Sequence, residues 1–300
     1  MQVRYAGNRQ DDFTARRALS MYRDLVDRSF QVYLFNLLIL QRVAEYARQD
    51  EARKRAKHLP SDEDKAFTAK LATNPALSSL SDNRELSTLY DRYHLGQALD
   101  ADQVRKLYRA FTKEEEHAVY LAKPDTTPAD DTKLLLALYR WLIKQEIFEA
   151  MVEDRFPLWD DDRSLVNGAM KKTIKAVPGR EDFFESYRKP VDAVTEFGET
   201  LLKYLGENDT ALTELIQPTL QNWDVERVAT IDMILIKMAV AEFTQFPTIP
   251  TKVTFNEYVD ISKRYSTDKS KEFVNGVLDK LLKQLQAGGM VQKEGRGLVE

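Results

Sequence analysis

A short basic segment near the end of the chain has the residue types of a phosphate-binding site. Lys269, Ser270 and Lys271 stand at the predicted start of the last long helix. A helix N-terminus presents N–H groups without intrahelical partners and the positive end of the helix dipole, and both attract anions. Two lysines and a hydroxyl beside these groups fit a phosphate. The alternative is that both lysines are solvated surface residues, and the segment alone leaves both interpretations open.

Phe273 follows in the same predicted helix and admits two roles. It belongs to an apolar stripe that is typical of a helix face packed on a core. The stripe consists of Phe273, Val277 and Leu281, with Val274, Leu278, Leu282 and Leu285 in the adjacent row. On spacing alone, Phe273 is expected in the core. The functional alternative is that it lies at the margin of the stripe and stacks on an exposed nucleic-acid base.

Patterns for catalysis and metal binding are missing from the sequence. His58, His94 and His117 lie far apart in polar segments, so we expect them to be exposed, and they form no HExxH motif or triad. The runs Asp160–Asp162 and Glu114–Glu116 lack the alternating ligands and the glycine of a calcium loop, so they are interpreted as solvated charge. The chain has no Cys and no glycine-rich nucleotide loop. We therefore predict a protein that is not an enzyme, with no cofactor and no metal site.

Helices must position these residues, because nearly every periodic segment of the chain has the helical period. The predicted fold class is all-α, built from helical bundles. Predicted helices span residues 13–57, as one long helix or two in series, and residues 101–111, 133–152, 165–174, 181–205, 211–220, 225–243, 254–265 and 269–285. In helix 181–205, Pro190 is expected to lie near a kink or break, and Gly206 is expected to end the helix. Thr254 and Glu257 predict a capping box at the start of helix 254–265.

The composition is that of a helical globular protein. The chain has 300 residues, of which 43% are hydrophobic and 31% charged. It is long enough to bury a core without disulfides, and the lack of Cys is compatible with a cytoplasmic location. The longest apolar run, Val32–Leu40, is too short to cross a bilayer, so no membrane role is expected.

Charge is spread unevenly along the chain, although the net charge is only −4. Residues 1–60 hold 12 Lys and Arg against 7 Asp and Glu, or +5. Residues 61–170 hold 14 against 21, or −7. This asymmetry permits a local basic patch that binds phosphates, with an affinity that falls as salt rises.

The segment from Asn222 to Leu282 resembles the NusB family of transcription antitermination factors. The resemblance rests on a series of ordered elements. These are Trp223 with Glu226-Arg227, Ile231-Asp232, Ala239 to Phe243, Ile249-Pro250 with Lys252-Val253, Asn256-Glu257, and Phe273-Val274-Asn275-Gly276-Val277-Leu278-Asp279-Lys280. It is strong over residues 212–285 and weak before residue 183. It implies a NusB-like fold of two packed helical bundles with an extra helical insertion.

Three parts follow from this resemblance. Residues 1–180 are predicted to form an N-terminal helical region whose acidic insertion spans about 48–175. Residues 181–286 are predicted to form the NusB-like C-terminal bundle, and residues 287–300 a disordered tail. Inside the bundle, Gly276 should cost roughly 1 kcal/mol relative to alanine, so we expect it to allow the close approach of a neighbouring helix. Asn275 would cap or bridge that contact.

The resemblance also implies binding roles. It adds Lys252 and the aromatic ring of Phe273 to the basic residues above. The residues that we predict to bind RNA are Arg4, Lys252, Lys269, Ser270, Lys271 and Phe273. At Lys269 the chain departs from the family, which often has an acidic residue there. Asp232, expected to point partly outward, corresponds to an acidic position in the region where NusB contacts the ribosomal protein NusE.

The N-terminal segment departs from the family pattern. Gln2-Val3-Arg4-Tyr5 resembles the family's Gln-x-Leu-Tyr, but Arg4 occupies a usually apolar position. The arginine-rich stretch that normally precedes this motif is absent. Either the true start lies upstream, or RNA binding uses other cations.

The expected function is that of a non-enzymatic factor that binds boxA-type RNA together with NusE. With NusA and NusG, it would help to assemble a processive RNA polymerase complex. Two alternatives stay open. One is a helical protein-interaction adaptor without RNA binding, which the net negative charge and the missing arginines favour. The other is the RNA-binding module of an RNA-modifying system, which the lack of a nucleotide loop and of a Cys nucleophile disfavours.

Overall fold

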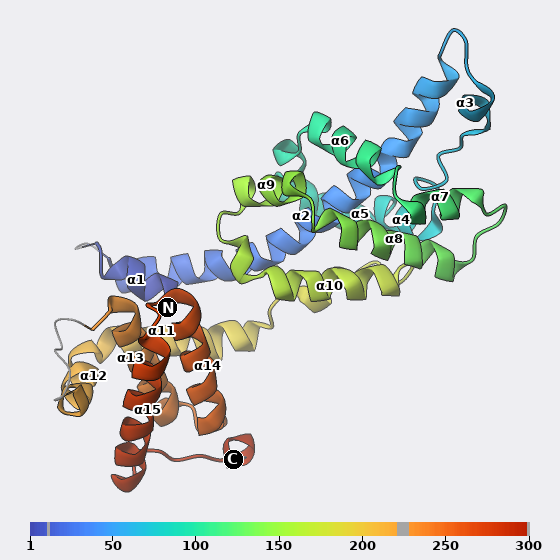
Figure 1. Cartoon of the computed structure of the whole chain (residues 1–300). Helices are drawn as coiled ribbons and strands as arrows, with labels where there is room; N and C mark the ends of the chain where they lie inside the picture. Colours follow the sequence, from blue (N-terminus) through green and yellow to red (C-terminus); the bar gives the residue numbers. More distant parts are fainter. Residues whose placement is uncertain (11–12, 221–227, 299–300) are drawn as a thin grey trace. The chain divides into compact units, whose positions relative to one another are not determined.

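The chain folds into helices, as the computed structural model of residues 1–10, 13–220 and 228–298 shows (Figure 1). Within these residues all regular secondary structure is helical, which confirms the all-α prediction. The chain divides into a terminal unit, Met1–Leu25 with Pro190–Glu300, and a central unit, Val26–Lys189. This division differs from the predicted boundaries, because the first 25 residues group with the C-terminal part. The motif residues Trp223, Glu226 and Arg227 lie outside the described residues.

The long helix α2 (Ala15–Arg55) confirms the helix predicted at 13–57. Its residues from Val26 onward belong to the central unit. Asn36, which interrupts the apolar run, is fully buried, and its side-chain amide donates to the Val32 carbonyl at 2.9 Å. A polar residue is tolerated in this core because its hydrogen bonds are made.

The remaining helices of the central unit are shorter. Many pack through α8, which contacts α4, α6, α7 and α10. Their bounds are α3 (Asp62–Ala66), α4 (Pro75–Ser81), α5 (Arg84–Arg92), α6 (Ala101–Phe111), α7 (Glu115–Ala122), α8 (Pro128–Leu142), α9 (Glu146–Arg155) and α10 (Arg163–Ala176), with 3-10 turns at Gly96–Ala98, Trp159–Asp161 and Phe183–Tyr187.

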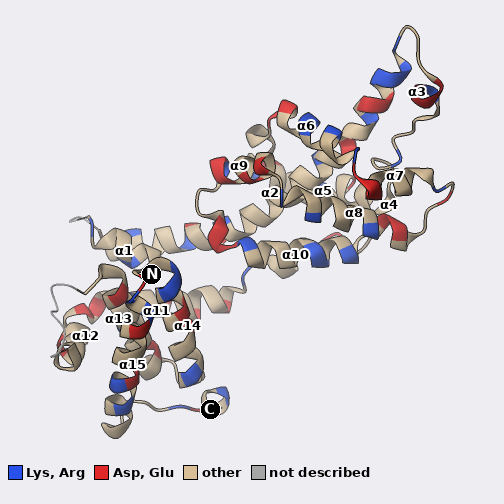
Figure 2. Cartoon of the chain, viewed as in Figure 1, with Lys and Arg blue, Asp and Glu red and all other residues tan. Residues whose placement is uncertain are grey.

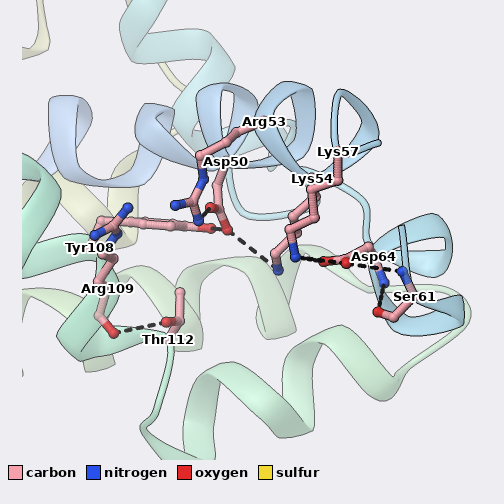
Figure 3. A network of polar contacts seen from close by, with 9 residues as sticks. All are labelled: Asp50, Arg53, Lys54, Lys57, Ser61, Asp64, Tyr108, Arg109 and Thr112. Carbon is pink, nitrogen blue, oxygen red and sulfur yellow. Dashed lines mark hydrogen bonds and ion pairs between the residues drawn. The ribbon is translucent and has the colours of Figure 1, made fainter. Parts of the chain in front are cut away.

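The charged end of α2 is neutralised inside the central unit. Figure 3 shows Asp50 between cations of its own helix, with Arg53 at 2.6 Å and Lys54 at 3.4 Å. Lys57 pairs with Asp64 at 2.7 Å, and Asp64 caps the start of α3 with Ser61. The basic tail of α2 is therefore engaged in intramolecular ion pairs.

Buried tyrosines predict that the central unit loses stability in alkaline solution. Burial raises the pKa of Tyr33, Tyr90 and Tyr139 above the usual value of 10.0. The folded state therefore keeps protons that the unfolded state releases above that value. The stabilisation is fully present below pH 10 and is lost as the pH rises above it, by about 1.4 kcal/mol per pH unit for each tyrosine. Urea unfolding from about pH 8 to about pH 11 should show this fall, and a flat profile would contradict it.

In the terminal unit, α13 (Thr230–Gln245) is the central helix. It contacts α14 (Thr251–Tyr265), α15 (Ser270–Ala287), α11 (Thr200–Glu207), α12 (Asp209–Ile216) and α1 (Gln2–Gly7). Its buried residues cover most of its circumference, as expected for a helix surrounded by others. The predicted stripe of α15 is confirmed, with Phe273, Val274, Val277, Leu278, Leu281 and Leu285 buried.

The helix predicted at 181–205 is confirmed only after Pro190, and the break expected near Pro190 is present. The structure has a 3-10 turn at Phe183–Tyr187, a π-helix at Ala193–Glu199 and then α11. Pro190 separates the first two, because a proline disfavours helical conformation in the residue before it. Gly206 lies within α11 and does not end it.

Residues 288–298 follow an ordered course where disorder was predicted. The side chain of Lys293 donates to the Phe246 carbonyl at 2.9 Å, and the Glu294 N–H donates to the Pro247 carbonyl at 3.0 Å. A Cβ atom at Gly297 would lie 1.9 Å from the Pro247 oxygen, so this glycine permits the close contact. Glycine-rich composition predicted flexibility here but could not reveal these tertiary contacts.

His117 is buried, not exposed as predicted. Its ring packs edge-on against that of Phe111, with 5.8 Å between the ring centroids. Burial lowers the pKa of His117, and nearby Lys54 lowers it further.

Among residues 1–10, 13–220 and 228–298, no helix is long and apolar enough to span a bilayer. Over the same residues, no group of three or more His, Asp or Glu side chains is arranged to hold a metal ion.

Candidate nucleic-acid interface

The turn between α14 and α15 positions the predicted phosphate-binding residues. Ser270 opens α15, and its side chain is only 1% exposed. Its hydroxyl lies 2.7 Å from Oδ2 of Asp232 on α13, and the Thr267 N–H donates to it at 3.1 Å. Because a hydroxyl has one proton, Ser270 donates to the carboxylate and accepts from Thr267. Ser270 thus fixes the turn from the inside, and the prediction that it binds RNA on the surface is not supported by its position.

Asp232 is the buried anchor of this turn. Its side chain is 3% exposed, and its other oxygen, Oδ1, has no hydrogen-bond partner among the described residues. The predicted outward orientation is wrong, because the period of α13 does not reveal which side the turn between α14 and α15 covers. A carboxylate at this depth is held by Ser270 and is poorly placed to contact a partner protein.

Lys269 and Lys271 lie on either side of Ser270, and both are exposed. Lys269 immediately precedes α15 and Lys271 lies in its first turn, where the backbone N–H groups favour an anion. Asp268 and Glu272 are exposed beside them, so the local net charge is close to zero. The geometry therefore fits one phosphate held by two lysines and a helix N-terminus, with weak long-range attraction.

Phe273 belongs to the core of the terminal unit and is 8% exposed. This burial confirms the position expected from its spacing. Stacking on a base needs an accessible ring face. The ring would have to leave the core to provide one, so we do not include Phe273 in the interface.

Lys252 is exposed in the first turn of α14, away from the other lysines. With a rise of about 1.5 Å per residue, it lies roughly 20 Å along α14 from the turn that carries Lys269. The structure therefore places Lys252 and the pair Lys269 and Lys271 at opposite ends of the helix. A single phosphate cannot contact both groups.

Arg4 is engaged within the terminal unit. Its guanidinium lies 2.7 Å from Oδ1 of Asp209, whose other oxygen lies 2.9 Å from Nζ of Lys237. Asp209 thus joins α1, α12 and α13. Because its charge is compensated and its side chain is only 23% exposed, Arg4 is less suited to RNA than Lys269 or Lys271.

A second buried carboxylate, missed in the sequence analysis, joins α14 to α13. Glu242 accepts from the hydroxyl of Thr254 at 2.7 Å and from that of Tyr258 at 2.9 Å. Burial and the adjacent Glu242 raise the pKa of Tyr258 well above its usual value. The predicted capping box is wrong, because α14 begins at Thr251 and Thr254 is buried against Glu242. The position of Glu242 between Ala241 and Phe243, in an otherwise apolar segment, was the available signal.

Gly276 does not allow the close approach that the sequence predicted. It lies exposed on α15 beside Asn275, and a Cβ atom there would meet no described atom of another element within 4 Å. Replacing Gly276 with alanine should therefore raise the free energy of unfolding by about 0.5 to 1 kcal/mol, because alanine favours the helix. Urea unfolding measures this change. Gly297→Ala is the control and should destabilise, since its Cβ would collide with Pro247; a destabilising Gly276→Ala would contradict the open environment.

Comparison with known proteins supports the family resemblance. Residues 179–283 match the model of the NusB family. The chain is 38% identical over 115 residues to the transcription antitermination protein NusB of Salinibacter ruber, covering 37% of this chain and 72% of that protein. It is 47% identical over 79 residues to the protein of the same name from Chloroherpeton thalassium, covering 26% of this chain and 37% of that protein. No solved structure matches the chain.

A third relative, the transcription antitermination protein NusB of Oleidesulfovibrio alaskensis, is 38% identical over 97 residues, covering 32% of this chain and 63% of that protein. For this relative and the Chloroherpeton protein, the chain matches less than two thirds of their length. The family match lies in the C-terminal third and leaves most of the central unit uncovered.

Proposed function

Because this chain belongs to the NusB family of transcription antitermination proteins, we propose that it binds boxA-type RNA together with ribosomal protein NusE. It is a non-enzymatic factor, and its contacts with the RNA add to those that NusE makes. In this proposal it acts in the cytoplasm on a nascent transcript. With NusA and NusG, it helps to assemble a processive RNA polymerase complex.

The observation that supports RNA binding most directly is the exposed pair Lys269 and Lys271 at the start of α15. Neither lysine has an ion pair among the described residues, and Ser270 between them is fixed to Asp232. The turn therefore holds the backbone of both lysines beside a helix N-terminus, so that mainly their side chains lose freedom on binding. Lys252 contacts a different phosphate at the far end of α14. Since Asp268 and Glu272 offset the local charge, NusE has to supply part of the binding surface.

Charge-neutral variants test this assignment in the full chain. Lys269→Gln with Lys271→Gln should weaken binding to boxA-type RNA by roughly tenfold at low salt in the presence of NusE. It should also reduce the salt dependence by about 0.7 per lost phosphate contact. Fluorescence anisotropy at several salt concentrations measures both quantities.

The matched control is Lys203→Gln with Lys283→Gln, which makes the same change in net charge on the terminal unit. Those lysines are exposed and pair with Glu199 and Asp279. Equal losses in both double variants would show that net charge, not the α15 site, controls binding.

A protein-interaction adaptor without RNA binding is the competing function. The engagement of Arg4 by Asp209 favours it, because it leaves one basic residue fewer for RNA. Equal affinity for matched and scrambled RNA, with NusE binding retained, would support the adaptor. Covalent modification of the RNA in an activity assay would instead support the RNA-modifying alternative.

A further inference from the structure

A basic hollow lies in the central unit, between α8 and the end of α10. Its volume is about 540 Å³. Lys133 and Arg140 of α8 and Lys175 of α10 line it, together with apolar residues that include Leu136 and Pro178. No carboxylate is among its lining residues. Within a region of the sequence that is acidic on balance, this surface is locally cationic.

The three cations of the hollow are exposed, and none has an ion pair with a described residue. The end of α2 in the same unit is different, because Arg53 and Lys57 there pair with Asp50 and Asp64. A cation without an ion pair attracts an external anion more strongly than one already paired with a carboxylate. The positive charge of the hollow is therefore not neutralised by ion pairs with described residues.

Local helical geometry brings these cations together. Lys133, Leu136 and Arg140 are spaced by three and four residues, so they share one face of α8. On α10, Lys171 and Lys172 stand one turn before Lys175, are exposed, and add to the same end of the helix. Figure 2 shows Lys and Arg along α10, and the sequence of α10 contains no acidic residue.

Nearby carboxylates are held away from the hollow. Asp130 forms an ion pair with Lys123, and Asp131 is buried and accepts from the Tyr120 hydroxyl at 2.7 Å. Glu115 and Glu116 line a separate hollow between α7 and α8, which shares only Lys133 with the basic one. On the other side, Asp82 and Glu181 line a further hollow that shares only Val177 with the basic one. The positive charge continues along α10, which contains no acidic residue.

We propose that this basic hollow binds the phosphate backbone of single-stranded RNA as a second contact, separate from the α15 site. This inference rests on the proposed function, which brings RNA to the protein. The hollow is lined by no aromatic side chain, so it has no platform on which bases would stack. It therefore adds affinity that does not depend on base sequence. The central unit, which the family match mostly leaves uncovered, gains a role in holding RNA that flanks the recognised element.

The test compares two triple variants of the full chain with NusE present. The hollow variant carries Lys133→Gln, Arg140→Gln and Lys175→Gln. The control variant carries Lys106→Gln, Arg109→Gln and Lys113→Gln, which changes the same residue types on α6 and the turn after it. These control residues are exposed and lie outside the hollow. The probe is a boxA-type RNA with unstructured flanking nucleotides, titrated by fluorescence anisotropy at several salt concentrations.

The hollow variant should bind this RNA roughly tenfold more weakly at low salt, and its salt slope should fall by about 2 for three lost contacts. The control variant should stay within about twofold of the unchanged protein. Circular dichroism should show equal helix content for both. If the two triple variants bind alike while Lys269→Gln with Lys271→Gln still weakens binding, the hollow has no role in RNA binding and the proposed function stands.

Two other results would also overturn the inference. If the unchanged protein with NusE has no affinity for the RNA at low salt, both the proposed function and the hollow's role fail. If the hollow variant loses affinity for a polyglutamate peptide but keeps its affinity for RNA, the hollow is a site for an acidic protein.

Discussion

The free energy of unfolding of the Ser270→Ala variant is expected to be about 3 kcal/mol lower than that of the unchanged protein. Alanine removes the hydroxyl that donates to Asp232 at 2.7 Å. The other oxygen of Asp232 has no partner among the described residues, so the variant leaves a buried carboxylate without a described donor. A charged group left unsatisfied in this way costs more than an ordinary hydrogen bond contributes.

Ser262→Ala is the matched control for this variant. Ser262 is also fully buried in the terminal unit, but its hydroxyl donates to the Val259 carbonyl within the same helix at 2.7 Å. Its loss should cost less than about 1 kcal/mol, because no buried charge depends on it. Urea unfolding, with amide hydrogen exchange in α13 and α15 to isolate the terminal unit, measures both variants. Equal effects would contradict the role of the Asp232 contact.

Replacing Glu242 with alanine is expected to cost about 3 kcal/mol as well. The change removes the acceptor for both Thr254 and Tyr258 and leaves a cavity between α13 and α14. Glu242→Gln keeps the shape and one acceptor oxygen, and its amide can donate to the second hydroxyl, so it should cost no more than about 1.5 kcal/mol. Urea unfolding of the two variants gives the comparison. A Glu242→Gln variant as unstable as Glu242→Ala would show that the charge, and not the hydrogen bonds, stabilises the contact.

The sequence predicted well the elements that repeat a pattern over many residues. The helical period over 13–57 gave α2 nearly to its ends, and the apolar rows from Phe273 gave the buried face of α15. Burying such a face is the dominant stabilisation of a helix in a globular protein, so the pattern and the structure agree. The all-α class follows from the same signal.

Single polar residues were predicted less well, because their environment depends on elements distant in the sequence. Asp232 and Ser270 are 38 residues apart and are buried only because the turn after α14 folds onto α13. Gly276 lies in the family motif, and no described residue approaches it closely enough to require a glycine. The hydroxyl of Thr254 donates to Glu242 and does not cap a helix. No local pattern encodes these contacts.

The sequence also does not show which charged side chains form ion pairs. The basic end of α2 and the basic face shared by α8 and α10 look alike in the sequence. The first is paired with Asp50 and Asp64, whereas Lys133 and Arg140 have no ion pair with a described residue. Only the fold distinguishes cations that stabilise the protein from cations that remain free for a ligand.

The most direct test of the central claim is the affinity of the full chain, assembled with NusE, for boxA-type RNA and for a scrambled RNA of equal length at low salt. The proposed function predicts tight binding to the matched RNA, weaker binding to the scrambled RNA, and a loss of affinity as salt rises. Absence of binding to the matched RNA, or equal binding to both, would contradict it.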